Sequence, residues 1–372
     1  MSETRPLLAA SELPVYAAAR YETAEAARAC PRADLALHLC SLCGYVWNAA
    51  HDPSQASYSE GYNASLHHSP RYAAFIDETI RRLALSHRLA GRRVVEAGCG
   101  EGRFLARLAQ LARCEAIGID PSAPAVAPAG VRFLREPLGA SHARLGAALA
   151  LCRHALHYLP DPVSFLETLS CTAEAIYLEV PNAMYVFGTC VPWAVFCEHV
   201  GYFGEAALRR TCARAGLHVT EAAPCFADEQ YLCALAAPAR YAEPLPEQST
   251  PDVAALVDAA QAFAAAYAAR IAAARNALAA HTGRRVVLWG AAGRGATFLA
   301  HCDPDAARVQ AVTDNNPARH GSFVPGTGHP IVAPEALPAL APDVLVLNND
   351  TYAAEIAAQA RALGLSADML VL

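Results

Sequence analysis

The chain has 372 residues, of which 17% are charged, and every basic residue is an arginine, for a formal net charge of −6. This length exceeds one typical domain and predicts two or three, each able to bury a core. The absence of a basic stripe argues against nucleic-acid binding, and no apolar run is long enough to span a bilayer. We expect a cytoplasmic protein, monomeric or homodimeric, whose thirteen cysteines form no disulfide.

Residues 1–75 are predicted to form a small leading module that resembles a zinc knuckle. Cys40 and Cys43 have the spacing of half a tetrahedral zinc site, but no second pair of cysteines accompanies them. Two alternatives therefore remain open: a bound zinc ion, or two thiols that pack a turn.

The module ends in a polar segment, residues 58–72, which is rich in aromatic, histidine and hydroxyl side chains. Tyr62 and His67 are the residues in it that we expect to line a substrate, as part of a lid. The alternative is a solvated connection into the helix predicted for 72–90.

Residues 93–120 contain a strand, a glycine turn, a helix and a second strand in succession. Val94 and Val95 are followed by Gly98 and Gly100, and the second strand ends at Asp120. Glycines allow the sharp turn and the close approach of a ligand. A carboxylate about 20 residues after such glycines is where a parallel sheet binds ribose hydroxyls.

An acidic residue, Glu96, precedes the first glycine, where it would repel a phosphate and favour a cationic ligand. The segment 96–102 resembles the first motif of class I S-adenosylmethionine-dependent methyltransferases, which favours that methyl donor over the dinucleotide of a dehydrogenase. The residues predicted to contact S-adenosylmethionine are Glu96, Gly98, Cys99, Gly100, Phe104, Asp120, Pro121, Arg153 and His154.

Further strands are predicted at 131–134, 147–152 and 175–179, which completes a methyltransferase domain over residues 76–240. Arg153 and His154 follow one of these strands, at the rim where ligands bind. Beyond the last strand, Glu198 and His199 lie in an aromatic setting and are the candidates for acid–base chemistry. We expect His199 to titrate near neutrality as the base, with Glu198 setting its charge or orienting a substrate hydroxyl. Asn182 and Tyr202 are predicted substrate contacts.

Residues 241–372 repeat the same order of elements after an alanine-rich amphipathic helix over 253–280. A glycine turn at 290–295 follows a strand, and the next strand leads to Asp314. Arg294 beside the turn suits an anionic group such as a diphosphate. The alternative is a remnant of the fold without a ligand. The predicted class is therefore α/β, with two doubly wound, Rossmann-like parallel-sheet domains.

Nearly the whole chain resembles the C-methyltransferases that act on nucleotide-linked deoxysugars. The segment 198–203, Glu-His-Val-Gly-Tyr-Phe, is similar to that family's Glu-His-Leu-Ser-Tyr-Phe element, and 290–295 and 325–331 are similar to its third domain. The resemblance implies C-methylation next to a keto group of a nucleotide-linked substrate, with His199 as base. This chain has Phe196 and Cys197 where the family has Tyr and His.

Three other functions remain open at this stage. The first is an O- or N-methyltransferase acting on a small secondary metabolite, which the change at Phe196 and Cys197 favours somewhat. The second is a binding or scaffold protein that has lost its chemistry, and the third is a dehydrogenase using either glycine turn. The glycine turn with Asp120 argues against a scaffold, and Glu96 argues against a dehydrogenase.

Overall fold

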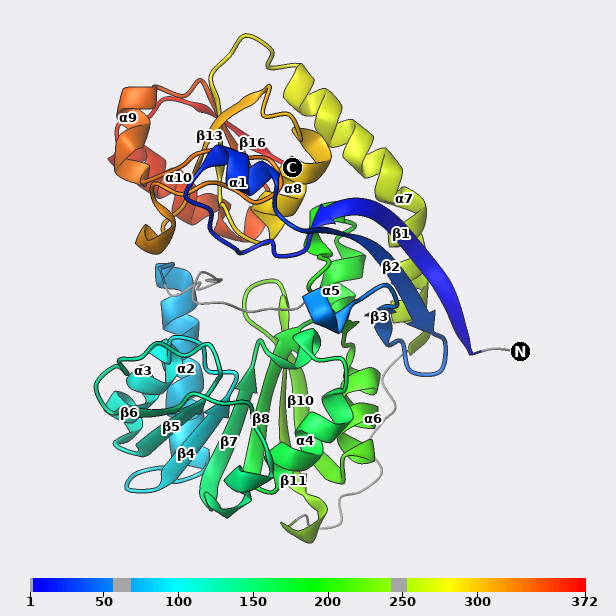
Figure 1. The fold of residues 1–372 in the computed structure, drawn as a ribbon, viewed down its shortest axis with the longest axis vertical. Helices are drawn as coiled ribbons and strands as arrows, with labels where there is room; N and C mark the ends of the chain where they lie inside the picture. The colour runs from blue at the N-terminus through cyan, green and yellow to red at the C-terminus, as the bar shows by residue number, and fades with distance from the viewer. Residues whose placement is uncertain (1–2, 56–67, 242–252) are drawn as a thin grey trace.

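The computed structural model describes residues 3–55, 68–241 and 253–372, which form three sheets (Figure 1). The largest is mixed, in the order β10-β11-β8-β7-β4-β5-β6, with the last five strands parallel. Its strands are β4 (Arg93–Ala97), β5 (Glu115–Ile119), β6 (Val131–Leu134), β7 (Ala147–Arg153), β8 (Ala173–Pro181), β10 (Leu217–Cys225) and β11 (Tyr231–Pro238). The five predicted strands are thus confirmed, while the antiparallel pair β10 and β11 was not predicted.

Helices cover both faces of this sheet, because its strands are apolar on both sides. One face packs on α4 and α6 and the other on α2 and α3, each with its own buried core. Side-chain caps by Ser69 and Asp161, each followed by proline, fix where α2 and α4 begin. The helices are α2 (Pro70–Ser86), α3 (Arg103–Ala112), α4 (Pro162–Ser170), α5 (Ala183–Gly188) and α6 (Glu205–Arg214).

The second sheet is parallel throughout and has the order β14-β13-β12-β15-β16. The predicted amphipathic helix over 253–280 is confirmed as α7, which buries residues at spacings of three and four from Leu256 to Leu278. The elements are α7 (Val253–Ala279), β12 (Val286–Trp289), α8 (Arg294–Cys302), β13 (Val309–Thr313), β14 (Ile331–Val332), α9 (Leu337–Leu340), β15 (Val344–Leu347), α10 (Ala353–Ala362) and β16 (Asp368–Val371).

The third sheet belongs to the leading residues but is completed by a strand from the middle of the chain. It contains β1 (Thr4–Pro14), β2 (Arg32–Cys40), β3 (Val46–Asn48) and β9 (Gly201–Tyr202), in that order. The short helix α1 (Ala24–Arg28) lies against the second parallel-sheet domain (Figure 1), where Gly326 N–H donates to Ala27 O at 2.8 Å. The leading residues therefore contact both larger domains.

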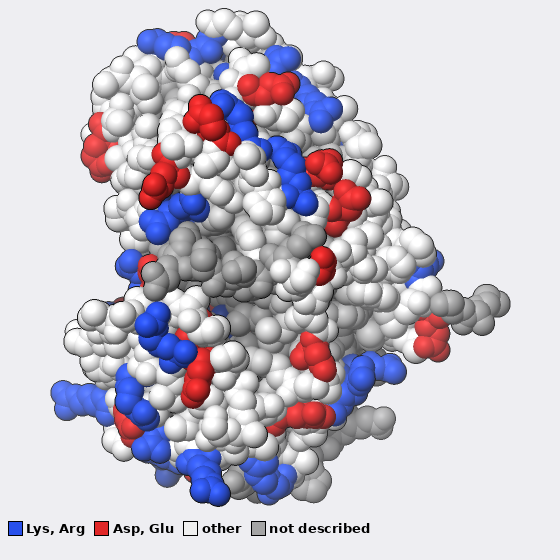
Figure 2. Space-filling view, in the orientation of Figure 1, with Lys and Arg blue, Asp and Glu red and all other residues white. Residues whose placement is uncertain are grey.

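Short 3-10 helices complete the chain at Pro53–Gln55, Ala140–Arg144, Leu156–Tyr158, Pro192–Ala194, Ala239–Tyr241, Pro317–Arg319, Pro334–Ala336 and Asp350–Tyr352. None of the described helices combines the length and the apolar composition needed to span a bilayer. Figure 2 shows arginine and acidic side chains interspersed over the face in view, without a basic stripe.

Two cysteine predictions meet the structure differently. Cys40 and Cys43 flank the tight turn between β2 and β3, where Gly44 N–H donates to Cys40 O at 2.9 Å. No group of three His, Cys, Asp or Glu in the described ranges is placed to hold a metal ion. The expectation of no disulfide is wrong, because Cys225 and Cys233 are bonded across the β10–β11 hairpin. The sequence did not indicate this pair, because the two thiols are brought together only by the β10–β11 hairpin, which was not predicted.

Candidate active site

The glycine turn after β4 has the geometry that the sequence predicts. Gly98 and Gly100 have φ angles of +76° and +52°, which side chains other than glycine rarely adopt. A Cβ at Gly98 would lie 2.5 Å from the Cβ of Ala155. Cys99 points toward β5, where its Sγ would lie 2.4 Å from a Cβ at Gly118. A Cβ at Gly100, by contrast, would have no heavy atom within 4 Å, so the turn leaves open space there.

Asp120 follows β5 and secures this turn. Its Oδ2 accepts a hydrogen bond of 2.8 Å from Gly100 N–H, and its Oδ1 accepts from the N–H and hydroxyl of Ser122. A carboxylate oxygen has two lone pairs, so Oδ2 can still accept from a ribose hydroxyl, whereas Oδ1 already accepts two hydrogen bonds. The next predicted contact, Pro121, is exposed beyond the strand end.

Glu96 is buried beneath the turn, with a side chain only 3% exposed. Its Oε1 lies 3.8 Å from Arg153 Nη1, while no described residue donates to its Oε2. Burial raises the pKa of this carboxyl to about 8, although the nearby Arg153 opposes the shift. A cationic ligand at the turn would find an acceptor here that the protein itself does not use.

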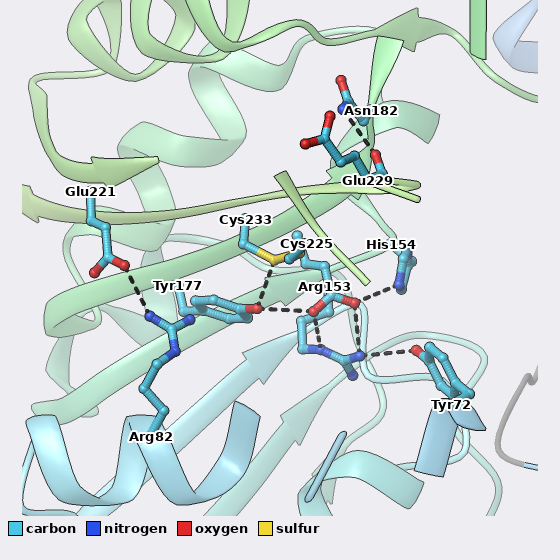
Figure 3. The surroundings of a disulfide bond; sticks show 11 residues. Tyr72, Arg82, Arg153, His154, Tyr177, Asn182, Glu221, Cys225, Glu229 and Cys233 are labelled. Carbon is cyan, nitrogen blue, oxygen red and sulfur yellow. Dashed lines mark hydrogen bonds and ion pairs between the residues drawn. A yellow bond between two sulfur atoms is a disulfide. The ribbon is translucent and has the colours of Figure 1, made fainter. Parts of the chain in front are cut away.

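A buried polar network lies beside Glu96 at the ends of β7 and β8 (Figure 3). Glu179 accepts hydrogen bonds from Arg153 at 3.0 and 3.3 Å and from the Tyr177 hydroxyl at 3.0 Å. Arg153 also donates to the Tyr72 hydroxyl at 3.1 Å, and His154 Nε2 lies 2.6 Å from Glu179 Oε1.

Two residues predicted to contact S-adenosylmethionine, Arg153 and Phe104, take part in this network or pack against it. The predicted contact Phe104 lies under the guanidinium of Arg153, whose carbon is 3.9 Å from the ring centroid. Glu179, Tyr177 and Tyr72 were not predicted as site residues. One feature of the sequence could have indicated them: the apolar strand 175–179 ends in a carboxylate, Glu179. A buried charge needs hydrogen-bonding or charged partners nearby.

His199 lies among aromatic rings on the loop before β9. Its ring centroid is 4.4 Å from that of His157, 4.6 Å from Phe196 and 5.2 Å from Tyr158. Burial, helped by His154, lowers the pKa of His199 to about 3. The expectation that it titrates near neutrality is therefore wrong, because this enclosure disfavours the imidazolium.

Glu198 points into a different environment from His199. Both residues belong to a turn closed by a 3.3 Å hydrogen bond from His199 N–H to Phe196 O. Glu198 lines a pocket against the leading residues, together with Asn48 and Asp34. The prediction that Glu198 sets the charge of His199 finds no support, while a role in orienting a substrate hydroxyl stays a prediction.

Two predicted substrate contacts, Tyr202 and Asn182, make hydrogen bonds inside the protein. Tyr202 is 1% exposed, and its hydroxyl accepts from Phe196 N–H at 3.1 Å. Asn182 caps α5 through Met184 N–H and donates to Glu229 O at 2.9 Å. Both residues hold loops in place, and their contact with a substrate stays a prediction. Two other predicted contacts, Tyr62 and His67, lie outside the described residues.

The second glycine turn repeats the first. Ala291 N–H donates to Asp314 Oδ2 at 2.8 Å, and Gly290 N–H donates to Thr313 O at the same distance. Arg294 begins α8, with its guanidinium carbon 5.3 Å from the centroid of the Tyr185 ring. The predicted arginine is thus placed beside the turn, close to a residue of the first domain.

The carboxyl ends of the two parallel sheets face each other. Trp193, which follows β8, donates to Asn348 O after β15 at 3.1 Å. Gln230 at the start of β11 donates to the Thr351 hydroxyl, and Arg71 donates to Thr351 O at 2.5 Å. The two glycine turns therefore open toward a common boundary between the domains.

Two protein families match the chain. A family described as a methyltransferase domain matches residues 66–222, and one described as a C-methyltransferase C-terminal domain matches residues 251–369. Together these matches span the chain from residue 66 to residue 369 apart from 223–250. No curated protein matches it.

Several solved structures resemble part of the chain. Magnesium protoporphyrin IX methyltransferase from Synechocystis PCC 6803, with bound SAH, is 19% identical over 45% of this chain and 83% of its own, with a TM-score of 0.36. The 1,6-didemethyltoxoflavin-N1-methyltransferase of Burkholderia thailandensis is 15% identical over 52% and 95%, with a TM-score of 0.34. An S-adenosylmethionine-dependent methyltransferase from Mesorhizobium loti is 16% identical over 44% and 99%, with a TM-score of 0.34.

Proposed function

We propose that this chain, which belongs to the methyltransferases that carry a C-methyltransferase C-terminal domain, methylates a carbon next to a keto group of a nucleotide-linked sugar or related metabolite. The methyl donor is S-adenosylmethionine. The observation that carries the proposal is the pair of matching glycine turns, each secured by a carboxylate, that open toward the same boundary.

The first turn is suited to the methyl donor. Asp120 stands where it can accept from the ribose hydroxyls, and Glu96 offers an unused carboxyl oxygen to the ligand's ammonium group. S-adenosylmethionine carries positive charge at both its amino group and its sulfonium. A buried acid below the turn suits that charge and disfavours a dinucleotide diphosphate.

The second turn is suited to an anionic part of the acceptor. The position equivalent to Glu96 is Leu288, two residues before Gly290, so no acidic group lies below this turn. Arg294 follows it at the first position of α8, where a helix N-terminus and a guanidinium both favour an anion. A diphosphate bound here would leave the attached sugar at the boundary with the donor domain.

Methyl transfer to carbon requires that the acceptor lose a proton to a base. Burial lowers the pKa of both His157 and His199, and neighbouring imidazoles lower it further. The sequence prediction of His199 as the base stays a prediction. Transfer to oxygen or nitrogen remains the second candidate, because Phe196 and Cys197 supply neither the hydroxyl nor the imidazole that the family has there.

The test has two stages. Calorimetry with S-adenosylhomocysteine measures whether the first turn binds the donor product. Purified enzyme is then incubated with trideuteromethyl S-adenosylmethionine and a panel of nucleotide-linked keto sugars and small hydroxyl or amine acceptors. Mass spectrometry and carbon NMR of the product should locate the methyl group on a carbon next to the carbonyl. A methyl group found on oxygen or nitrogen would contradict the proposal in favour of the second candidate.

A further inference from the structure

We infer that the disulfide between Cys225 and Cys233 is a reversible redox switch of the boundary between the two parallel-sheet domains. In the oxidised protein the loop of residues 226–230, which lies between these cysteines, contacts the second domain. Reduction by a dithiol releases that contact and loosens one side of the boundary. The switch works in the same way whichever acceptor the protein methylates.

The loop 226–230 has a strained backbone. Four successive residues, 226–229, have φ angles of +57°, +22°, +51° and +66°. None of the four is glycine or asparagine, the residues that adopt the left-handed region most readily. Left-handed residues normally occur singly, so a run of four persists only where the surrounding structure enforces it. We therefore expect the loop to relax toward an ordinary conformation once a constraint on it is removed.

Two constraints hold the loop in this conformation. The N–H of Gln230 donates to Phe226 O at 3.0 Å and so closes the left-handed turn. The disulfide joins the residue before the turn, Cys225, to Cys233 on the returning strand. A disulfide limits the conformations open to the chain that it encloses. Opening the bond removes the covalent constraint and leaves the strained turn to its hydrogen bonds.

The same turn supplies contacts with the second domain. The side-chain amide of Gln230 donates to the Thr351 hydroxyl, and the Phe226 ring packs against Tyr352 at 6.4 Å between centroids. Thr351 and Tyr352 follow β15, at the carboxyl end of the second sheet. Phe226 and Gln230 are the first and last residues of the turn, so a turn that relaxes gives up both contacts together.

Other contacts across the boundary do not involve the loop. Trp193 donates to Asn348 O, and the Ser69 hydroxyl donates to Glu355 Oε2 at 2.8 Å. These contacts are present in either redox state of the cysteines. Reduction therefore changes the mobility of one side of the boundary without separating the two domains.

The bond lies where a reductant can reach one of its sulfur atoms. β10 is the outermost strand of its sheet, and Cys225 at its end is half-buried, whereas Cys233 on β11 is only 7% exposed. A thiolate of the dithiol attacks Cys225 Sγ, and the electrons of the S–S bond pass to Cys233 Sγ. The second thiol of the reductant then displaces Cys225, so the reductant becomes a cyclic disulfide. Its two protons end on the two cysteine thiols.

A hydrogen-bond donor stands beside the sulfur that leaves. The Tyr177 hydroxyl lies 3.1 Å from Cys233 Sγ and 3.0 Å from Glu179 Oε2 (Figure 3). It can donate to the Cys233 thiolate as the S–S bond breaks, and hydrogen bonds to ionised acceptors are the strong ones. The switch is thus in contact with the buried network that holds Arg153 beside the donor turn.

The remaining cysteines also favour a reversible bond. Of the thirteen cysteines of the chain, eleven are free thiols, and Cys225 with Cys233 is the bonded pair. Small secreted domains that need disulfides for stability are dense in them, whereas a disulfide among reduced thiols is usually transient or redox-sensing. A single bond beside eleven free thiols fits the second pattern.

The test follows backbone amide hydrogen exchange in the folded, full-length protein. The protein is equilibrated with oxidised glutathione or with dithiothreitol, and alkylation with mass spectrometry reads the state of each cysteine. Reduction should speed exchange at residues 350–353 at least fivefold, because the loop no longer contacts them. Exchange at residues 286–289, in the core of the same domain, should change less than twofold. Returning the protein to oxidised glutathione should restore the original rates.

Three variants separate the switch from other effects of the reductant. Cys225→Ser with Cys233→Ser should exchange at 350–353 as fast as reduced wild type in either condition, which controls for the other thiols. Gln230→Ala should speed exchange at 350–353 with the disulfide intact, because it removes the amide contact with Thr351. Asp228→Asn, at an exposed position of the same turn, is the matched control and should leave those rates unchanged.

Several outcomes would overturn the switch. One is a pair of cysteines that oxidised glutathione does not join, or a bond that dithiothreitol does not open in the folded protein. Another is a reduction that leaves exchange at 350–353 unchanged, or that speeds exchange at 286–289 equally, as general unfolding would. A response to dithiothreitol that persists in the double serine variant would assign the effect to other thiols.

Discussion

Asp120 and Asp314 occupy equivalent positions at the ends of β5 and β13 and make the same two contacts. Each Oδ2 accepts a 2.8 Å hydrogen bond from the N–H of a glycine turn, and each Oδ1 accepts one of 2.8 Å from the N–H two residues further on. The two turns differ in charge, since Glu96 lies below the first and Arg294 beside the second. The chain therefore repeats one arrangement of turn and aspartate, with an acid near the first turn and an arginine near the second.

Although the two aspartates are equivalent in structure, we expect the same substitution at each to affect binding of S-adenosylhomocysteine differently. Asp120→Asn should weaken binding of S-adenosylhomocysteine at least tenfold, because it removes the charge from a hydrogen bond to Gly100 and from the ribose site; such bonds contribute about 1.5–3 kcal/mol. Asp314→Asn makes the same chemical change in the other domain and should leave that affinity unaltered. Calorimetry on both variants decides the matter. Equal weakening by the two would mean that the first turn is not the donor site.

Binding of S-adenosylmethionine should release a proton. The pKa of Glu96 in the unliganded protein is raised to about 8, so the carboxyl is protonated at pH 6, and a cationic ligand favours its ionised form. Affinity should therefore rise with pH, by close to tenfold per unit, between pH 5.5 and 7.5. Calorimetry in two buffers of different ionisation enthalpy measures the proton count. Glu96→Gln should bind the ligand more weakly, and its affinity should not rise with pH in this range. If the pH dependence survives in Glu96→Gln, the released proton comes from another group.

The disulfide should stabilise the β10–β11 hairpin. It joins residues eight positions apart (Figure 3). The loop between them carries Phe226 against Tyr72 and Gln230 against the second domain. Reduction, or Cys225→Ser with Cys233→Ser, should lower the free energy of unfolding by about 2 kcal/mol. The rate of backbone amide hydrogen exchange at residues 226–230 should increase when the disulfide is absent. Cys171→Ser, at an exposed free thiol, is the control. Two additional titratable thiols in the unreduced, denatured protein would show that the bond does not form.

The buried carboxylate of Asp303 should contribute strongly to the free energy of unfolding of the second domain. Asp303 accepts hydrogen bonds from the N–H groups of Ala307 at 3.0 Å and Val309 at 2.8 Å, and its Oδ2 lies 3.1 Å from His329 Nε2. Asp303→Ala should cost about 3 kcal/mol, because it leaves several buried donors without an acceptor. Asp305→Ala, on the exposed part of the same loop, should change stability by less than about 0.5 kcal/mol. Chemical denaturation of both variants gives the comparison, and similar losses would refute the special role of Asp303.

The sheets could be predicted from the sequence because their signal is local. Each parallel strand is a short apolar run followed by glycine or a polar residue, as at Ala147–Arg153, where every residue is buried. β10 and β11 were not predicted, since an antiparallel edge pair depends on the partner strand as much as on its own residues.

The site could be predicted only in part. The glycine turns and their aspartates are separated by a fixed spacing and were recognisable. The pairing of His154 with Glu179 joins residues on neighbouring strands, and no spacing in the sequence indicates it. Glu198 and His199 are adjacent in the sequence, yet their side chains lie in different surroundings. Sequence proximity is a poor guide in a loop, because side-chain direction there follows no period.

The short strand β9 has a consequence for anyone who recombines these enzymes. It pairs with β3 through Val46 and Tyr202, and Asn48 donates to Cys197 O at 3.2 Å. The loop bearing His199 is thus aligned by a residue 149 positions earlier in the chain. A chimera that exchanges the first fifty residues would have to supply a β3 that fits the recipient's β9. Crossover points for directed evolution should accordingly keep these two segments from the same parent.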